Sequence, residues 1–350
     1  MLPVLQSEHV ALKLLAREIP LTPKTAYAKV TLHFDDASEY HGVYVLVEDI
    51  DRTALKRRQL STEGRLEKSS TYNCSPEVEF DDGLPNAATA AFRSLLAKDP
   101  ADHPNRWAAE AERGLDLDVA LRQEAAREIL VNGNDTLFNS RNPPGWGNNW
   151  LAFDPRDGLR QYVPWDLDLA FGQQGGSCQP TPLACPATVP LMTWCTGPAT
   201  GPMSPYAQTS SRLGLHVVCQ PEIAPRYLRA MCELTQGSLS AEAILAVWIR
   251  AHAMLESVVP LEQDTVWRGI DPLASPSDPQ VIETLGSEHR RIQAWIPTRI
   301  AHVQAELSRL GIACPSVCRS GEARACSHLG RQSTRLCEDG RWTSCRPTPL

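Results

Sequence analysis

The sequence lacks the excess of basic side chains that a nucleic-acid-binding protein needs. Its 350 residues include 34 lysines and arginines against 41 aspartates and glutamates, which gives a net charge of −7. Because binding to phosphate groups depends on clustered basic side chains, this balance argues against a nucleic-acid partner. Charged residues make up only 21% of the chain and hydrophobic residues 42%, so wholesale disorder is excluded as well.

The sequence also has no recognisable secretion signal and no membrane span. Ser7, Glu8 and His9 begin a charged stretch where a signal peptide would have its apolar core. The longest uncharged run, 173–211, holds seven prolines and four glycines, which would leave backbone donors unpaired in lipid. The 11 cysteines are nevertheless typical of an oxidising compartment. We therefore expect a secreted or cell-surface protein, and a start codon placed too far downstream or a trimmed chain would reconcile the two observations.

Motifs of two common enzyme classes are missing. No His-Glu-x-x-His is present, so the nine histidines are expected at the surface or in the core rather than on a metal. No Gly-x-Ser-x-Gly elbow is present either, so a serine hydrolase is not supported.

Hydrophobic spacing and turn residues predict a mixed α+β fold. Strands are expected over 26–34, 42–50, 150–153 and 159–163, and helices over 5–18, 86–98, 117–131, 221–235, 240–258 and 278–310. The polar connection 35–39 predicts that the first two strands form an antiparallel pair. Asp116 or Asp118 is expected to cap the helix over 117–131, and Pro297 is expected to interrupt the last helix.

The most informative stretch is 116–172. A helix leads to the acidic loop 132–135, a second loop carries Asn148 and Asn149, and a tight hairpin ends in Pro164-Trp165-Asp166-Leu167-Asp168. The same order of helix, acidic loop, hairpin and acidic turn occurs in the catalytic half of protein kinases, although the HRD and DFG motifs of ordinary kinases are absent. Carboxylate and amide oxygens are the ligands that a hard divalent cation prefers.

Four blocks of the chain resemble the CotH family, the spore-coat protein H kinases. They are YHGVYVLVEDID at 40–51, GRLEKSS at 64–70, NGNDTLFN…NNW at 132–150 and PWDLDLAFG at 164–172, and they follow one another in the family's order. The family consists of atypical, secreted or surface-associated protein kinases. The resemblance implies a protein-kinase-like bilobal fold with a shortened N-lobe and a mainly helical C-lobe. It also implies transfer of the γ-phosphate of ATP to serines of partner proteins with Mg²⁺ or Mn²⁺.

Matching positions in these blocks imply the functional residues. Asp135 is implied as the catalytic residue that accepts the proton of the acceptor hydroxyl. Four residues are implied at the metal, with Asp168 as the principal ligand: Asp168, Asp166, Asn149 and Asn148. Two residues are implied near the nucleotide: Lys68 and Glu48. The sequence departs from the family at Glu67, where the family has a tyrosine.

Each implied residue also has a plain structural explanation. Asp166 and Asp168 could cap a turn or a helix, and Asp135 could form an Asx-turn. We favour the functional reading for these three because the upstream blocks are in register. For Lys68 a solvated surface position is equally good. For Glu48 a role with Asp51 in capping a helix is equally good, and both alternatives stay open.

The last part of the chain is expected to form a separate module. Five of the 11 cysteines lie in 312–350 without the paired C-x-x-C spacing of zinc sites, so a small disulfide-bonded module is expected. We divide the rest into a partial N-lobe and inter-lobe region, 1–113, and a kinase-like C-lobe, 114–311. The proline-rich segment 173–211 lies where a kinase places its activation and substrate region, and Cys178, Cys185 and Cys195 are candidates to staple it.

The sequence as a whole therefore predicts an atypical protein kinase that acts on hydroxyl groups of surface or secreted proteins. The alternative is a catalytically inactive kinase-like scaffold that binds a partner through the proline-rich segment and the tail. The oligomeric state is left open.

Overall fold

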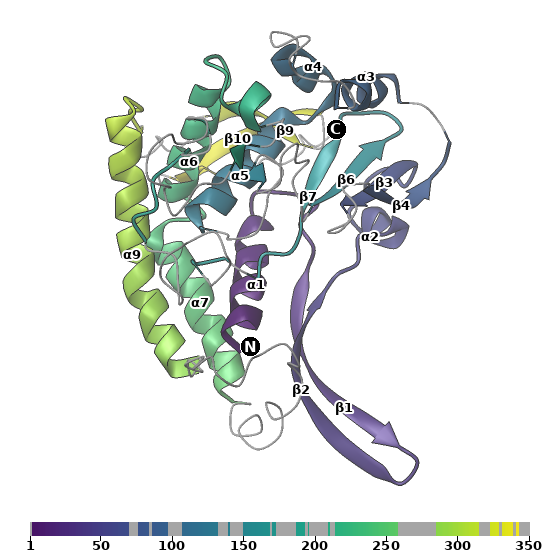
Figure 1. Ribbon diagram of the computed structural model, residues 1–350, viewed down its shortest axis with the longest axis vertical. Helices are drawn as coiled ribbons and strands as arrows, with labels where there is room; N and C mark the ends of the chain where they lie inside the picture. Colours follow the sequence, from purple (N-terminus) through teal and green to yellow (C-terminus); the bar gives the residue numbers. More distant parts are fainter. Residues whose placement is uncertain are drawn as a thin grey trace.

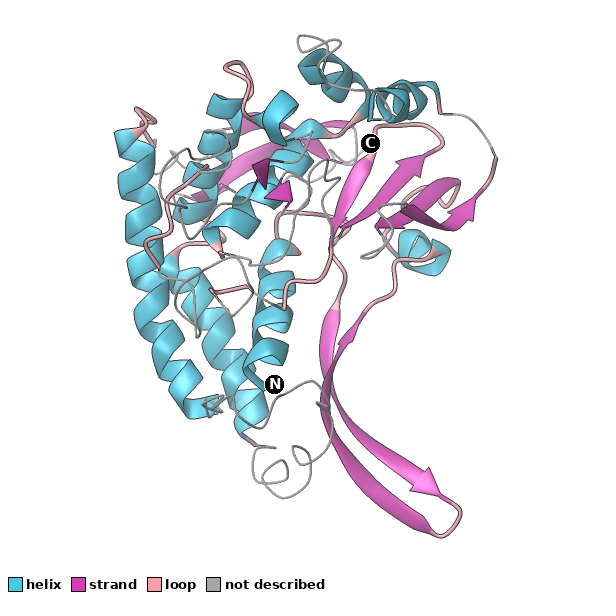
Figure 2. Cartoon of the chain, viewed as in Figure 1, coloured by secondary structure: helices cyan, strands magenta, loops and turns pink. Residues whose placement is uncertain are grey.

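The computed structural model is a mixed α+β structure, which confirms the predicted class (Figures 1 and 2). The bilobal arrangement and the boundaries between the predicted domains stay predictions. The structure describes residues 2–69, 76–83, 86–96, 107–131, 139–140, 150–168, 170–172, 187–192, 195, 209–210, 214–257, 285–314, 323–328, 331–338 and 341–342.

The predicted first helix is present as α1, Leu2–Leu15, and it is a core helix. Its buried side chains, none more than 1% exposed, include Val10, Leu12, Leu14 and Leu15. It packs against α7 (Ala241–Glu256) and α9 (Leu285–Arg309), as Figure 1 shows. The amide of Gln6 donates to the carbonyl of Trp248 on α7 at 3.2 Å. A helix surrounded in this way can carry a polar side chain into the interior at a fixed position.

The first two strands form the predicted antiparallel pair, β1 (Thr25–Phe34) and β2 (Ala37–Val47). The predicted connection 35–39 was too long, because β2 begins at Ala37 and pairs at once with Phe34. The strands form a long two-stranded ribbon that extends away from the other elements (Figure 1). Residues 42–47 of β2 lead towards the body of the protein and end next to the loop that precedes α2 (Arg52–Arg57).

One face of this hairpin is apolar and exposed. Tyr44 pairs with Ala28 and Leu46 with Ala26, so both lie on the face that carries the even-numbered residues of β1. Leu46 is 55% exposed and Phe34, on the same face of β1, is 57% exposed. Exposed apolar side chains therefore lie near both ends of the hairpin on this face.

A second, four-stranded antiparallel sheet has the order β4-β3-β6-β7. Its strands are β3 (Gly64–Ser69), β4 (Pro76–Asp81), β6 (Trp150–Pro155) and β7 (Gln161–Pro164), and the predicted hairpin over 150–163 is confirmed. Leu66, Leu151 and Val163 form a core cluster with Ala54 and Leu55 of α2. Asp51 caps α2, because its carboxylate accepts from the amide of Ala54 at 2.7 Å.

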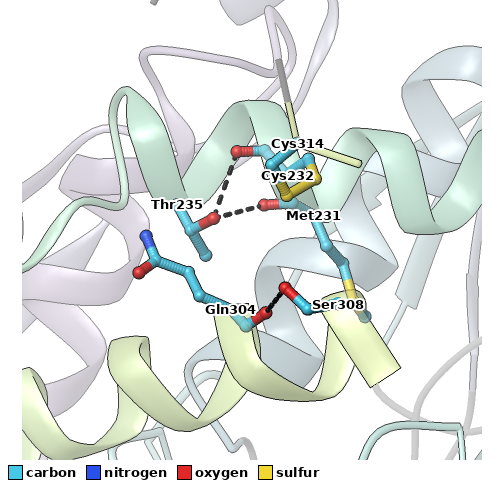
Figure 3. The surroundings of a disulfide bond; sticks show 6 residues. All are labelled: Met231, Cys232, Thr235, Gln304, Ser308 and Cys314. Carbon is cyan, nitrogen blue, oxygen red and sulfur yellow. Dashed lines mark hydrogen bonds between the residues drawn. A yellow bond between two sulfur atoms is a disulfide. The ribbon is translucent and has the colours of Figure 1, made fainter. Parts of the chain in front are cut away.

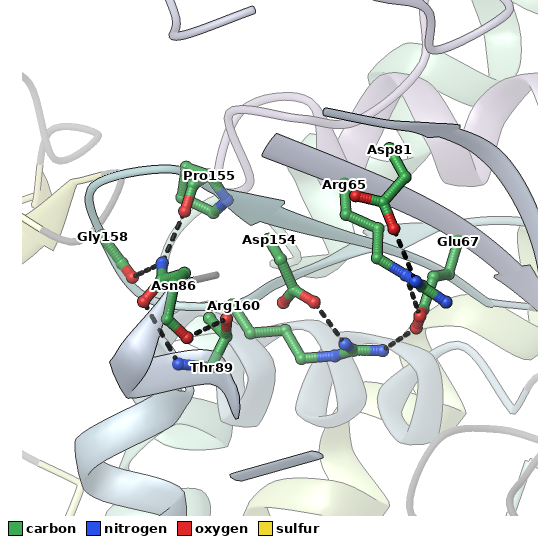
Figure 4. Close-up of polar contacts among 9 residues, drawn as sticks. All are labelled: Arg65, Glu67, Asp81, Asn86, Thr89, Asp154, Pro155, Gly158 and Arg160. Atoms are coloured by element: carbon green, nitrogen blue, oxygen red, sulfur yellow. Dashed lines mark hydrogen bonds and ion pairs between the residues drawn. The ribbon is translucent and has the colours of Figure 1, made fainter. Parts of the chain in front are cut away.

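Buried charges cross the same sheet (Figure 4). The guanidinium of Arg160, 1% exposed, donates to Asp154 at 2.8 Å and to Glu67 at 2.9 Å. Arg65 donates to the other oxygen of Glu67 at 2.6 Å. Glu67 therefore replaces the family's tyrosine by a buried ion-pair partner. Removing one member of such a group leaves an uncompensated charge and costs about 3–5 kcal/mol.

Five helices of the remaining part lie at predicted positions: α3 (Ala87–Leu96), α5 (Leu117–Ile129), α6 (Ala224–Gln236), α7 and α9. A further helix, α4 (Trp107–Gly114), was not predicted. Asp116 caps α5 as expected, since its carboxylate accepts from the amide of Val119 at 3.4 Å. Asn86 caps α3 by accepting from the amide of Thr89 at 3.3 Å, and its side-chain amide donates to the carbonyls of Pro155 and Gly158 in the hairpin (Figure 4).

The predicted interruption at Pro297 was wrong, because α9 continues through this residue. The proline is exposed, whereas Ile296, Ile300 and Val303 bury the inner side of the helix. Packing along this side outweighs the single backbone hydrogen bond that the proline removes. In the described part of the chain no single helix has the length and apolar character of a membrane span; α6 and α7 reach these values only as a pair bent by 60°.

Two disulfides lie in the described part of the chain. Cys195–Cys219 confirms that Cys195 staples its segment, while Cys178 and Cys185 lie outside the described residues. Cys232–Cys314 joins α6 to the residues that follow α9 (Figure 3). Beyond it lies a three-stranded sheet of β9 (Ala323–His328), β10 (Arg331–Glu338) and β11 (Arg341–Trp342), and β9 contacts α5. Two short strands, β5 (Asn139–Ser140) and β8 (Thr209–Ser210), pair with each other, and Gly214–Val218 forms a π-helical turn.

Candidate active site

The candidate site is built around the turn that follows β7. This strand ends at Pro164, and Trp165, Asp166, Leu167 and Asp168 follow it. Leu167 is fully buried and anchors the turn in the core. Asp166 has a φ of 54°, in the left-handed region that side chains other than glycine seldom adopt. A backbone held in such a conformation must be supported by its surroundings and is found most often at functional sites.

The two carboxylates of this turn repel each other. Burial, together with the charge of Asp168 and a hydrogen bond between the two side chains, raises the pKa of Asp166 to about 7. A hydrogen bond between two carboxyl groups needs a proton on one of them, so Asp166 holds its proton more tightly than an exposed aspartate does. A divalent cation can replace this proton, because it relieves the same repulsion.

Two cationic side chains lie beside the pair and oppose this rise in pKa: Arg127 of α5 and Lys68 of β3. Arg127 is 2% exposed and donates to the carbonyl of Trp165 at 3.2 Å. Burial lowers the pKa of Arg127, and the charges of Glu124, Asp166 and Asp168 act in the opposite direction. The Lys68 ammonium lies 4.9 Å from the centroid of the Trp165 ring. A cation–π contact of this kind holds the ammonium beside the turn.

A third carboxylate reaches the same region from α1. The pKa of Glu8 is raised to about 7, first by burial and then by the charges of Asp166 and Asp168. Glu8 therefore lies in the field of the acidic turn, although more than 150 residues separate it from Asp166 in the sequence. No local pattern in the sequence indicates a role for this residue. Only the burial of α1 brings it to the site.

The end of α5 is joined to the end of the acidic turn. The amide of Phe171 donates to the carbonyl of Leu130 at 2.6 Å, and the amide of Gly172 donates to the carbonyl of Val131 at 3.2 Å. Val131 and Phe171 have φ values of 48° and 62°. Three side-chain-bearing residues with positive φ therefore surround this junction: Val131, Asp166 and Phe171.

The Phe171 ring fixes this junction from the other side. Its centroid lies 5.3 Å from that of Trp248 on α7 and 6.5 Å from that of Trp295 on α9, in edge-to-face geometry in both cases. Arg291 of α9 donates to the carbonyl of Phe171 at 3.1 Å. The α1, α7 and α9 layer therefore holds the turn as well as Glu8.

Glu48 lies at the end of β2 and is occupied by basic partners. Its carboxylate accepts from Arg57 at 3.1 Å, from Arg58 at 3.1 Å and from the amide of Lys24 at 3.0 Å. Burial opposes ionisation of Glu48, but the hydrogen bond and charge of Arg58 and the bond from Lys24 lower its pKa below the ordinary value. These contacts do not bring Glu48 to the Asp166–Asp168 pair, and its role near a nucleotide stays a prediction.

Three of the predicted residues lie outside the described residues: Asp135, Asn148 and Asn149. The chain enters the first of these loops from Val131 and leaves the second at Trp150, which pairs with Pro164 directly before the acidic turn. The described residues thus bring together Asp166, Asp168 and Lys68.

The carboxylate oxygens of Asp166 and Asp168 are suitable ligands for a divalent cation that is also bound to phosphate. Mg²⁺ is commonly bound through one or two carboxylates, with phosphate oxygens and water completing its ligands. Across the described ranges, no group of three or more His, Cys, Asp or Glu side chains is spaced to hold a metal ion.

Comparison with known proteins agrees with this chemistry. The family model for CotH kinase proteins matches residues 5–303, which covers α1, both sheets of the first half, the acidic turn and most of α9. No curated protein matches the chain.

Proposed function

Because the chain belongs to the CotH kinase family, we propose that it is an atypical protein kinase, which transfers the γ-phosphate of ATP to serine or another hydroxyl group of surface or secreted proteins. The observation that carries the proposal is the Asp166–Asp168 pair with Lys68 beside it. Mutually repelling carboxylates favour a cation, and an adjacent ammonium favours an anion. Both preferences are met at once by a metal-bound nucleotide phosphate.

Each residue of the candidate site has its own role in the proposed reaction. Asp168, assisted by Asp166, would hold Mg²⁺ or Mn²⁺, and the predicted loop residues Asn149 and Asn148 would complete the protein ligands. The bound cation neutralises charge on the phosphate oxygens. Lys68, held over Trp165, supplies a further positive charge to the phosphates.

The acceptor side of the reaction depends on the loop that follows α5. Asp135 orients the acceptor hydroxyl and takes its proton while the new oxygen–phosphorus bond forms and the bond to ADP breaks. The end of α5, from which the chain leads to Asp135, is hydrogen-bonded through Leu130 and Val131 to residues 171 and 172 after the acidic turn, which supports this division of roles.

Two disulfides and membership of the CotH family are compatible with an extracellular or spore-coat location. We place the protein outside the cytosol, where the acceptor proteins of the proposed kinase are also found. Reducing cytosolic conditions would favour opening of both disulfides, Cys195–Cys219 and Cys232–Cys314.

Calorimetry of ATP binding, with and without MnCl₂ or MgCl₂, tests the nucleotide site. We expect metal-dependent binding by the unaltered chain and its loss in Asp168→Ala. Asp157→Ala is the matched control, because Asp157 is an exposed aspartate in the hairpin turn of the same sheet. Phosphate incorporation from labelled ATP into serine peptides should be lost in Asp135→Asn, while ATP binding is retained.

The alternative, a kinase-like scaffold without catalysis, predicts the opposite result. The unaltered chain would then bind no ATP at millimolar concentration in the presence of Mn²⁺. The same result would refute the proposed kinase.

A further inference from the structure

Arg299, in the second half of α9, is buried, and its side chain donates to backbone carbonyls of two described segments. It is 1% exposed. Its Nε donates to the carbonyl of Ile129 at 3.1 Å and one Nη to that of Glu128 at 2.8 Å. Its other Nη donates to the carbonyl of Ala187 at 3.2 Å and to that of Val189. One side chain therefore joins the end of α5 to the segment 187–189.

The end of α5 is held from two sides as a result. A helix leaves its last carbonyls without partners inside the helix. Here the carbonyls of Glu128 and Ile129 accept from Arg299, and those of Leu130 and Val131 accept from the amides of residues 171 and 172. The positive charge of Arg299 also complements the negative end of the helix dipole.

A second contact fixes the same segment. The carboxyl of Glu128, on α5, accepts from the amide of Met192 at 2.5 Å and from the hydroxyl of Tyr227 at 2.7 Å. Met192 has a positive φ of 52°, and Cys195 after it is tied to Cys219. The segment 187–192 is thus fixed at both of its ends against α5.

We propose that Arg299 is a positioning residue for phosphate transfer. It holds two parts of the chain at fixed positions relative to the Asp166–Asp168 turn. One is the C-terminal end of α5, which leads to Asp135, and the other is the segment 187–192. This proposal rests on the proposed function and names the element that aligns the acceptor side of that site. Misplacement of a reacting group by about 1 Å can lower a rate by roughly 100-fold.

The arrangement requires an arginine in particular. Its planar guanidinium carries several donors in a fixed fork and reaches four carbonyls in two segments, whereas a lysine ammonium is a single point charge. Arg299→Lys therefore keeps the charge near the end of α5 and removes the geometry. Arg122→Lys is the matched control, because Arg122 of α5 bridges Glu18 at 3.0 Å and Glu233 at 2.5 Å and lies away from the exit of the helix.

The experiment measures transfer from labelled ATP to a library of peptides with one serine among randomised residues, with ATP binding measured in parallel by calorimetry. Arg299→Lys is expected to lower kcat for transfer by roughly 10- to 100-fold and to leave the Kd for ATP unchanged. Hydrogen exchange at the amides of Phe171, Gly172 and Met192 is expected to accelerate in this variant. Arg122→Lys is expected to lower Tm by a similar amount, but to leave kcat and the exchange rates of these amides unchanged.

The possible outcomes separate the two proposals. If the unaltered chain binds no metal–ATP and transfers no phosphate, the proposed function is wrong and the role of Arg299 in transfer is wrong with it. If the unaltered chain transfers phosphate and Arg299→Lys does so equally fast, or if Arg122→Lys slows transfer as much, only the role of Arg299 is overturned.

A second variant covers the case in which Arg299→Lys does not fold. Glu128→Leu combined with Tyr227→Phe removes both partners of one buried hydrogen bond, and only the Met192 amide loses its acceptor, at a cost of about 1–3 kcal/mol. It frees the Met192 amide and is expected to lower kcat in the same way, with ATP binding unchanged. An unchanged kcat in this variant would overturn the part of the proposal that gives the segment 187–192 a role in positioning.

Discussion

Replacement of Asp166 by asparagine is expected to stabilise the folded protein at pH 8 and to have little effect at pH 4. The pKa of Asp166 is raised from 3.8 to about 7, mainly by burial and by Asp168. Asparagine has almost the same shape, carries no charge, and tolerates the left-handed backbone that this position requires. The variant therefore removes the electrostatic cost and little else.

The sign and size follow from proton linkage. The folded state holds the proton more tightly than the unfolded state, so the cost of ionisation is absent below about pH 4, grows between pH 4 and 7, and is complete above pH 7. The folded pKa exceeds the ordinary value of 3.8 by about 3, and each pKa unit corresponds to 1.36 kcal/mol, so the cost of ionisation is about 4 kcal/mol. This is an upper bound, because Asp168 and Glu8 share the same field. At about 2.1 cal/mol/K per residue, the unfolding entropy of 350 residues converts it into a rise in Tm of roughly 5 °C.

Thermal unfolding followed by circular dichroism at pH 4, 6 and 8 in the presence of a chelator measures this effect. Asp157→Asn, in the exposed hairpin turn, is the control and should show no pH-dependent gain. Added ATP with MnCl₂ should stabilise the unaltered chain at pH 8 and leave Asp166→Asn less affected. An equal gain at pH 4 and pH 8, or a loss at pH 8, would show that the carboxylate pair carries no electrostatic cost.

Three further predictions use other features of the structure. Glu8→Gln should raise Tm at pH 8 and not at pH 4, because burial and the acidic turn raise the pKa of Glu8 to about 7; a pH-independent change in thermal unfolding would contradict this. Replacing Cys232 and Cys314 together by alanine should lower the free energy of unfolding in urea by about 4 kcal/mol, since the disulfide closes a loop with a sequence separation of 82 residues; an unchanged midpoint would refute it. Phe34→Thr with Leu46→Thr should reduce self-association in sedimentation experiments without a change in Tm, because both side chains are exposed on one face of the hairpin; an equal sedimentation profile would count against this.

The parts of the fold that could be predicted from the sequence are those set by neighbouring residues. Asp116 caps α5 because an aspartate side chain reaches the third amide after it, and this needs only the local sequence. The hairpin over 150–163 follows in the same way from two short runs on either side of the turn-forming residues 154–158, which include a proline and a glycine. The acidic turn could be identified because its residues are contiguous, from Pro164 to Gly172.

The parts that could not be predicted depend on contacts between distant segments. Glu8 reaches the acidic turn only because α1 is buried against α7 and α9, and no residue near Glu8 in the sequence signals this. Glu67 departs from the family's tyrosine, and its role became clear only from its contacts with Arg65 and Arg160. The continuity of α9 through Pro297 was also missed, because burial of one side of a long helix decided it rather than local preference.

The backbone at the candidate site is in conformations that local preference disfavours, and this is itself an argument for function. Val131, Asp166 and Phe171 all have positive φ, and a β-branched or aromatic residue pays for that conformation in stability. The hydrogen bonds of residues 171 and 172 to the end of α5 hold these conformations in place. The Phe171 ring, set between Trp248 and Trp295, adds further support. A turn that served only to connect β7 to the next segment could use glycine at such positions, so the strain is best explained by the need to present Asp166 and Asp168 in one fixed geometry.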